Sequence, residues 1–202
     1  MTKKLPYLYI ISGCNGAGKT TASFTILPEL LNVKEFVNAD EIARGLSPFQ
    51  PQKVSIEAGK IMLRRLQELL NQKEDFAFET TLSSRSFVGL IKQAKELGYM
   101  VNLVYYWLDS VNLAIERVKI RVSEGGHHVS TDIVVRKYYA GLKNFINLYR
   151  DKVDFWILID NSKTEPQLIS EGRSSETEVV ANQAKWFLIN KIVGDDTIGN
   201  KR

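Results

Sequence analysis

Residues 13–20 read GCNGAGKT and match the pattern G-x-x-x-x-G-K-[ST] at each of its fixed positions. The stretch directly follows the apolar run from Tyr7 to Ser12, and the pattern is informative only between such a strand and a helix. Its glycines let the backbone curl, so that N–H groups surround phosphate oxygens at the positive end of the following helix. The sequence therefore predicts a phosphate-binding loop between the first strand and the first helix.

Two side chains at the end of this loop add to the backbone contacts. Lys19 is expected to reach the β and γ phosphates as a point charge, and the Thr20 hydroxyl is an oxygen of the kind that Mg²⁺ binds. ATP or GTP with Mg²⁺ is the expected ligand. Cys14 is interpreted as a small tolerated residue and not as a redox switch. The residues predicted to bind the nucleotide, with Thr20 also binding the metal, are Gly13, Asn15, Gly16, Ala17, Gly18, Lys19, Thr20 and Thr21.

Further apolar runs rich in β-branched and aromatic residues read as strands. They alternate with longer segments whose apolar residues recur at helical spacings of three and four. Strands that are apolar throughout and alternate with helices favour a parallel sheet with both faces covered, so we expect an α/β fold. The five expected strands are Tyr7 to Ser12, Phe36 to Asn38, Phe76 to Glu79, Val101 to Leu108 and Phe155 to Asp160.

Helices are expected over residues 56–70, 88–97 and about 110–124, with Asp109 or Ser110 as the cap of the third and Gly125-Gly126 as its stop. Another helix should begin near residues 130–132. No linker or repeat divides the chain, which predicts one domain over residues 1–202, with a core at about 7–162 and an extension at 163–202. In the extension, residues 162–178 read as turn-rich, 179–192 as a last helix and 194–202 as a frayed end.

The composition is that of an ordinary globular domain, with 44% hydrophobic and 25% charged residues in 202. The net charge of +4 is spread along the chain, which suits small anionic ligands and does not predict nucleic-acid binding. A single cysteine excludes an internal disulfide and a cysteine-rich zinc site, and favours a reducing compartment. No signal pattern or membrane-spanning apolar segment is present, so a cytoplasmic protein is expected.

Asp40 and Glu41 are adjacent acids that follow the second expected strand. This is the carboxyl edge at which open α/β sheets bind ligands. Asp40 could orient an acceptor hydroxyl and take its proton during phosphoryl transfer. Alternatively, both acids only favour the dipole in the first turn of a helix. Asn38 is expected to cap that helix.

Glu79 ends the third expected strand at the same edge. It could orient the acceptor, hold a magnesium-bound water, or only bond to the neighbouring loop. Thr80 and Thr81 follow it, and they are open between ligand contact and helix capping.

Arg117 and Arg121 lie one helical turn apart, just before the segment Gly125-Gly126-His127-His128. The arrangement indicates a lid that brings cations over the transferring group, with Arg121 as the preferred arginine. The alternative is a solvated helix face with acidic neighbours. Two adjacent histidines without cysteine partners do not predict zinc, so anion contact or exposure is expected there.

Residues 136–139 read Arg-Lys-Tyr-Tyr and form a basic and aromatic patch. The patch could hold an acceptor, although tyrosines at such spacing more often belong to a core or an interface.

Four segments in this order resemble the zeta-toxin-like P-loop kinase family: the loop at 13–20, Asn38-Ala39-Asp40, Phe78-Glu79-Thr80-Thr81 and Gly125-Gly126-His127. The resemblance covers about residues 7–162. It implies a P-loop NTPase fold, with a parallel five-stranded sheet in the kinase order 2-3-1-4-5, flanking helices and a helical lid. It also implies an ATP- or GTP-dependent phosphotransferase that acts on an alcohol group, as the founding toxins act on UDP-N-acetylglucosamine.

By the same resemblance, Asp40 would be the base and Arg121 would stabilise the phosphate, while Glu79 and Thr81 would contact the acceptor. Ser83 and His127 stand where the toxins have arginines, and Arg85 or Arg136 could substitute for these. The predicted catalytic residues are Asp40, Lys19 and Arg121, and the predicted substrate-binding residues are Glu79, Thr81, Arg85, Arg117, His127 and Arg136.

Two functions remain open at this point. The first is a kinase acting on a hydroxyl of a small acceptor, with a sugar or nucleotide sugar as the expected class. The second is an interaction module whose ATP site is a switch, such as a toxin held inactive by a small helical antitoxin. A kinase acting on nucleic-acid ends is not expected, because no dense Lys/Arg stripe offers contacts along a strand.

Overall fold

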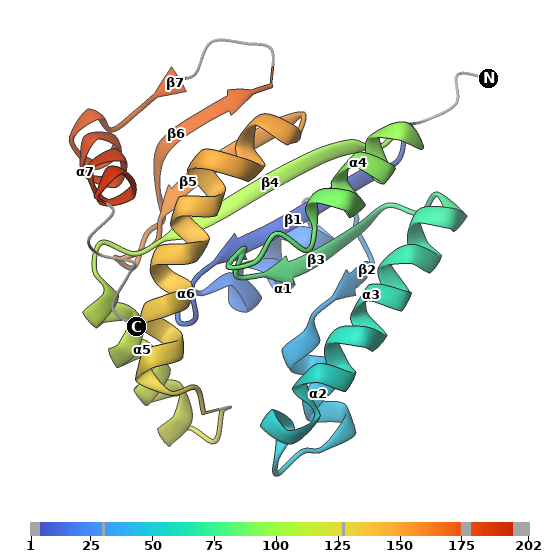
Figure 1. Cartoon of the computed structure of the whole chain (residues 1–202), viewed down its shortest axis with the longest axis horizontal. Coiled ribbons are helices and arrows are strands. Elements are labelled where there is room, and N and C mark those ends of the chain that lie inside the picture. Colours follow the sequence, from blue (N-terminus) through green and yellow to red (C-terminus); the bar gives the residue numbers. More distant parts are fainter. Residues whose placement is uncertain (1–4, 30, 127, 175–178, 196–202) are drawn as a thin grey trace.

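The structure is a computed structural model that describes residues 5–29, 31–126, 128–174 and 179–195 of the chain. All five predicted strands form, and they pair in parallel in the predicted order 2-3-1-4-5. Figure 1 shows this sheet with α4 and α6 in front of it and α1 behind it. The strands are β1 (Tyr7–Gly13), β2 (Glu35–Val37), β3 (Phe76–Thr80), β4 (Met100–Trp107) and β5 (Phe155–Asp160).

The extension after β5 differs from the prediction. Residues 162–178 were expected to be turn-rich, but β6 (Gln167–Arg173) pairs antiparallel with β5, and β7 (Val179–Val180) pairs antiparallel with β6. In β6 the first two residues are exposed, and a glycine, Gly172, packs against the Trp156 ring. The sequence of β6 therefore lacks the alternation of apolar and polar residues that would predict a strand. The sheet therefore has two more strands than the sequence predicts.

The last helix also starts later than predicted. α7 (Gln183–Gly194) begins after Asn182, whose side chain accepts a hydrogen bond from the Lys185 N–H, so residues 179–182 are not helical. The prediction of a frayed end over 194–202 is wrong for Gly194, which belongs to α7, while residues 196–202 lie outside the described residues.

The remaining helices form close to their expected places. They are α1 (Lys19–Glu29), α2 (Ala39–Leu46), α3 (Ser55–Gln72), α4 (Val88–Glu96), α5 (Val111–Ser123) and α6 (Thr131–Asn144), with short turns at Pro51–Val54, Phe145–Tyr149 and Arg150–Lys152. Ser110 caps α5 by accepting from the Leu113 N–H, as predicted. Gly125 then takes φ +85° and the Gly126 N–H bonds to the Arg121 carbonyl, which ends the helix.

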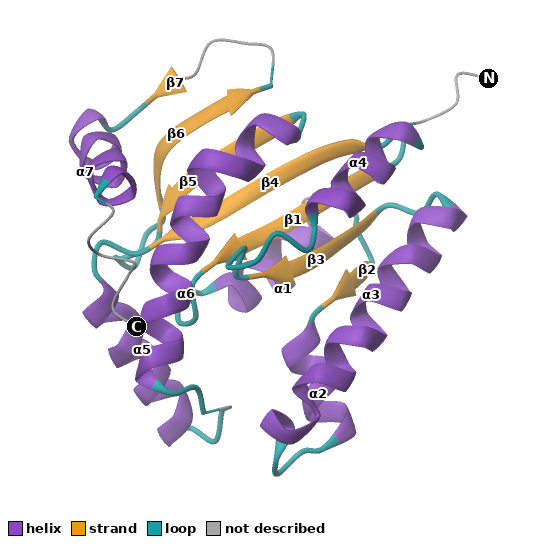
Figure 2. Ribbon diagram, viewed as in Figure 1, coloured by secondary structure: helices purple, strands orange, loops and turns teal. Residues whose placement is uncertain are grey.

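Side chains alternate between two apolar cores, one on each face of the sheet. Ile10 and Phe78 pack on one face, among residues of α3, α4 and the turn after α6. Ile11 and Ala77, their neighbours in sequence, pack on the other face against α1 and α5. Because β1 to β5 are all parallel, their carboxyl ends meet at one edge, as the arrowheads in Figure 2 show. Candidate site residues from distant parts of the sequence are thereby brought to that edge.

No helix in the described part of the chain combines the length and apolarity needed to cross a membrane.

Candidate active site

The loop after β1 has the backbone that the glycine pattern predicts. Gly13, Gly16 and Gly18 take φ of +140°, +82° and +80°, and α1 begins at Lys19. At Gly13 a Cβ would lie 2.3 Å from the Tyr106 carbonyl oxygen, so a larger residue meets both strain and a clash. The loop is therefore held against the end of β4, with the positive end of α1 behind it.

Lys19 is buried at this loop. Its ammonium donates to the Cys14 carbonyl at 2.9 Å and lies 3.4 Å from Glu79 Oε1. Burial raises the pKa of the Cys14 thiol to about 11, which agrees with a small packing residue and not with a reactive thiolate.

Glu79 is the centre of a hydrogen-bond network beneath the loop. Its Oε2 accepts from the Thr20 hydroxyl at 2.7 Å and from the Asn38 amide at 3.0 Å. The contacts arise because β3 lies between β1 and β2, so the acid at its end meets residues that follow both neighbours. The structure thus brings Glu79 to Lys19 and Thr20, the two side chains predicted to bind phosphate and magnesium.

Asp40 comes shortly after the neighbouring strand β2 and lies in the first turn of α2. Asn38 caps this helix as predicted, because its side-chain oxygen accepts from the Asp40 N–H at 2.8 Å. The Asn38 amide therefore joins the backbone of Asp40 to the Glu79 carboxylate. Asp40 and Glu41 are both exposed, but Glu41 forms an ion pair with Arg44 on the surface of α2, with 3.6 Å between the charged atoms. Of the two adjacent acids, Asp40 is the one close to the network.

The donor set near Glu79 suits magnesium. Thr20 and Glu79 offer a hydroxyl and a carboxylate 2.7 Å apart, and hard oxygen ligands are those that Mg²⁺ prefers. Among the described residues no group of three or more His, Cys, Asp or Glu side chains could hold a metal by itself, so a magnesium ion here would need phosphate oxygens as well. The Asn15 Oδ1 is buried without a hydrogen-bond partner in the described chain, which leaves this amide available to a ligand.

Arg117 lies on the other side of the phosphate loop. Its guanidinium donates to the carbonyls of Asn161 and Ser162 at 2.8 and 3.0 Å, and its Cβ packs near Gly16. Asn161 in turn donates to the Ala17 carbonyl at 2.8 Å. Since β4 and β5 lie on one side of β1 and β3 and β2 on the other, Arg117 is separated from the Asp40 and Glu79 group.

The loop after β5 is braced by the C-terminal extension. Asp160 is buried at the end of β5, where its carboxylate accepts from the Lys185 ammonium of α7 and from the backbone N–H of Ser162. Burial alone raises the pKa of Asp160, but the hydrogen bonds from Lys185 and Ser162 outweigh it and lower the pKa overall. No local sequence signal connects Lys185 to this site, because the pairing exists only once β6 and α7 are in place.

Arg121 lies half-buried near the end of α5, and Gly126 packs directly against its side chain. His127 lies outside the described residues, and His128 is exposed. Arg85 and Arg136 are both exposed, on the segment after β3 and on α6. The structure therefore brings none of these arginines into the hydrogen bonds around Glu79.

The segment after β3 is rich in hydroxyl groups. The Thr81 and Ser83 hydroxyls lie 2.9 Å apart, and the Thr80 hydroxyl accepts from the Leu82 N–H. Neither threonine caps a helix, since α4 begins later and Phe87 precedes it, so the capping alternative is wrong.

Lys137 is a further candidate residue, which the sequence placed only within the basic and aromatic patch at residues 136–139. It is half-buried on α6, whereas Arg136, the residue chosen from that patch, is exposed. Burial lowers the pKa of Lys137, and the nearby Asp40 carboxylate opposes this effect. Lys19 and Arg136 lower the pKa further by charge repulsion. The helical stripe of buried residues at Val134, Tyr138 and Leu142 would have indicated that Lys137 lies beside the inward face.

Comparison with known proteins agrees with this architecture. The Zeta toxin family model matches residues 1–171. An uncharacterized protein of Haemophilus influenzae is 35% identical over 127 residues, which are 62% of this chain and 88% of that protein.

Solved structures extend the similarity to the fold. The AvrRxo1-ORF1:AvrRxo1-ORF2 structure with sulphate ions aligns with a TM-score of 0.76 at 19% identity, over 94% of this chain and 64% of that one. A chain of the PezAT toxin–antitoxin system of Streptococcus pneumoniae aligns with a TM-score of 0.63 at 14% identity, over 100% of this chain and 90% of that one. This chain spans less than two thirds of the AvrRxo1-ORF1 structure. With the family model matching most of its length on a P-loop kinase fold, the chain belongs to the zeta toxin family.

Proposed function

We propose that this protein is a cytoplasmic kinase that transfers the γ-phosphoryl group of ATP to a hydroxyl of a small acceptor. The observation that carries the proposal is the network in which Glu79 holds Thr20 and Asn38 and lies 3.4 Å from the Lys19 ammonium. It links the phosphate loop to the start of α2, where Asp40 lies. Phosphoryl transfer depends mostly on positioning and charge stabilisation, and this arrangement supplies both.

Each residue has a role that follows from its place. The N–H groups of the loop and the Lys19 ammonium bind the β and γ phosphates. Asp40 orients the acceptor hydroxyl and accepts its proton as the oxygen attacks the γ-phosphorus. Thr20 and Glu79 would hold magnesium, which neutralises charge on the phosphate oxygens when it is bound. In this proposal Glu79 acts on the metal side of the reaction and not as a direct acceptor ligand.

The acceptor would lie between Asp40 and the hydroxyl-rich segment after β3. Thr81 and Ser83 can donate to and accept from a polyhydroxylated molecule, which supports a sugar or nucleotide sugar. Arg121 would approach the phosphate when the lid closes over the site. Arg117 bonds to the loop after β5, and in this proposal it would lie on the side of the nucleotide away from the acceptor.

A second candidate function is regulation by a small protein partner, as in a toxin–antitoxin pair. The solved relatives with this fold include a toxin–antitoxin system and an ORF1:ORF2 complex, also solved with ATP. Among the described residues, Phe49 is 97% exposed between α2 and α3, and Ile56 is 77% exposed in the first turn of α3. If a partner covers an apolar surface here, these two side chains are the ones that it would contact. Co-purification with the product of an adjacent short reading frame, lost in Phe49→Asp, would support this reading.

The kinase proposal is tested with purified protein, γ-labelled ATP and a metabolite extract. Wild-type protein should label an extract component, and Asp40→Ala should bind ATP normally but transfer the label about 100-fold or more slowly. Lys19→Ala should lose ATP affinity itself. Glu41→Ala is the matched control, because it removes the adjacent acid from the surface of the same helix turn. Equal transfer by the Asp40→Ala and Glu41→Ala variants would remove Asp40 from the mechanism.

A further inference from the structure

The strongest observation beyond these roles is the position of Lys137 on α6. Gly141, one helical turn later, packs so closely on the segment after β3 that a Cβ would lie 2.3 Å from the Thr81 carbonyl oxygen. Asn144, almost two turns after Lys137, donates to the Leu82 carbonyl at 2.7 Å. Residues 137, 141 and 144 share one helical stripe, so the face of α6 that carries Lys137 lies against the end of β3.

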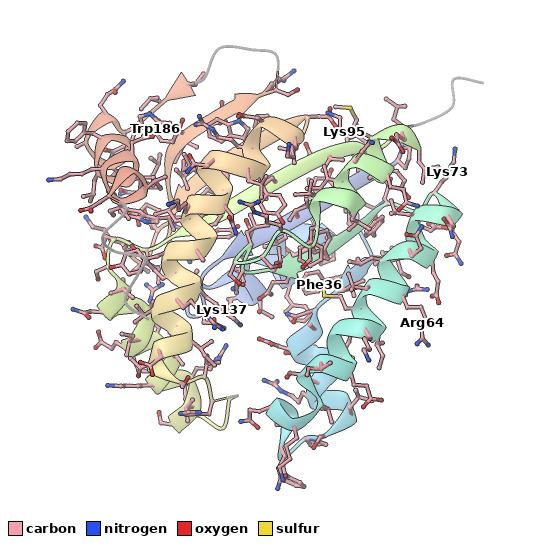
Figure 3. The ribbon with its side chains drawn as sticks, viewed as in Figure 1. Phe36, Arg64, Lys73, Lys95, Lys137 and Trp186 are labelled. Carbon is pink, nitrogen blue, oxygen red and sulfur yellow. The ribbon has the colours of Figure 1, made fainter. Side chains whose placement is uncertain are left out.

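The position of Lys137 relative to the sheet follows from a contact of the next residue, Tyr138. The Tyr138 hydroxyl donates to the carbonyl of Leu108, just after β4, so this turn of α6 lies at the carboxyl edge of the sheet. Side chains on a helix lean toward its N-terminus, which carries Lys137 about one turn, or roughly 5 Å, beyond Thr81. Figure 3 shows Lys137 beside α6 on the side toward α2 and β3. The edge that it reaches is where the phosphate loop and Asp40 lie.

The charge of Lys137 is only partly offset by its described neighbours. Within the described residues no carboxylate lies within ion-pair distance of its ammonium, although the residue is half-buried. Lys19 and Arg136 lie close enough to repel it, and Asp40 attracts it from the surface of α2. A desolvated ammonium next to a second lysine is unfavourable unless an anion binds there. The Lys137 and Lys19 ammonium groups therefore favour the binding of an anionic ligand between them.

We propose that Lys137 is a catalytic residue whose ammonium contacts the γ-phosphoryl group during transfer, from the side opposite the phosphate loop. This assignment rests on the proposed kinase function. The acceptor oxygen bonds to the γ-phosphorus, the bond from that phosphorus to the bridging oxygen breaks, and its electron pair leaves with ADP. The acceptor proton passes to Asp40, and Lys137 keeps its own protons throughout. Lys137 thus stabilises charge between the attacking and leaving oxygens.

The variants for the test are Lys137→Met and Lys137→Arg, with Lys143→Met as the control. Lys143 lies on the same helix and is exposed, so its replacement removes the same charge outside the site. The affinity for ADP, the affinity for ADP with aluminium fluoride and the rate of ATP turnover are measured for each protein. The fluoride complex imitates the phosphoryl group in transfer, so it reports on contacts made in the transition state.

Lys137→Met should leave the ADP affinity within about 2-fold of wild type, but should weaken the fluoride complex and slow turnover by about 100-fold. Lys137→Arg should recover part of the affinity for the fluoride complex and part of the turnover rate. Lys143→Met should resemble wild type in all three measurements. A Lys137→Met protein that binds the fluoride complex as wild type does would overturn the assignment.

If Lys137→Met does not fold, Lys137→Gln compared with Lys137→Arg carries the same test. If the wild-type protein turns over no ATP and gains no affinity from fluoride, the proposed function fails first, and the role of Lys137 with it.

Discussion

Lys185 on α7 provides a test of how far the C-terminal extension supports the nucleotide site. The Lys185→Met change removes the ammonium that bonds to Asp160, whose side chain is 3% exposed, while the Lys185 side chain is 24% exposed. Removing one partner of a fully buried pair costs about 3–5 kcal/mol. Ser162 still donates to Asp160 and Lys185 is partly solvated, so we expect a loss of about 2 kcal/mol of stability.

The same change should affect nucleotide binding. Asp160 directly precedes Asn161, which donates to the Ala17 carbonyl of the phosphate loop, and Arg117 bonds to the carbonyls of residues 161 and 162. Loosening this loop should weaken ATP binding by about 10-fold, or about 1.4 kcal/mol. Lys191→Met, on an exposed position of the same helix, is the matched control.

Thermal and urea unfolding at several pH values, with ATP titrations at pH 7, would measure both effects. At the chain's length a loss of 2 kcal/mol corresponds to a fall in Tm of about 4–8 °C. The lowered pKa of Asp160 means that the pair stabilises the fold above the unfolded-state pKa of about 3.9, and that this stabilisation is lost as the pH falls through the lower folded-state pKa. The difference between wild type and Lys185→Met should therefore shrink in acid. If Lys185→Met has the same Tm and the same ATP affinity as Lys191→Met, the contact between Lys185 and Asp160 does not support the nucleotide site.

Three further changes test other contacts. Glu79→Gln should keep the ATP affinity within a few-fold of wild type but slow ATP turnover about 100-fold and raise the magnesium concentration that turnover requires. Turnover measured at increasing magnesium concentrations tests this, and an unchanged magnesium requirement would contradict the metal role of Glu79. Gly141→Ala should cost about 2 kcal/mol or more, seen by urea unfolding, because its Cβ meets the Thr81 carbonyl; a stabilised protein would show that α6 does not pack there. Arg117→Met should weaken ATP binding several-fold, by titration, and leave the acceptor KM unchanged; a raised acceptor KM with normal ATP affinity would contradict its placement.

The five strands of the central sheet could be predicted from the sequence because each signal was local, whereas their order came from the family resemblance. The loop from Gly13 to Thr20 fixes a strand before it and a helix after it, and the caps at Asn38 and Ser110 follow from single side chains. The two antiparallel strands could not be predicted in the same way. β6 has Leu168 and Ile169 as its apolar residues, one exposed and one buried, so its pattern shows neither strand nor helix.

The candidate site was predictable where its residues end strands, and not where they come from packed helices. Asp40 comes soon after β2 and Glu79 lies near the end of β3, and the family order brings them to one edge. Whether Glu79 meets the acceptor or the phosphate loop depends on β3 lying beside β1, and the observed bonds to Thr20 and Lys19 favour the loop. Lys137 owes its position to the packing of α6, which depends on contacts distant in sequence.

The central claim is that this site transfers a phosphoryl group and does not merely bind ATP. Phosphorus NMR of ATP, magnesium and a nucleotide-sugar fraction incubated with the wild-type protein tests it most directly. We predict that the γ-phosphate signal is replaced by the signals of ADP and of a new phosphomonoester. Asp40→Ala, at equal ATP occupancy, should form the phosphomonoester about 100-fold more slowly. Release of ADP with inorganic phosphate alone, at the same rate in both proteins, would contradict it.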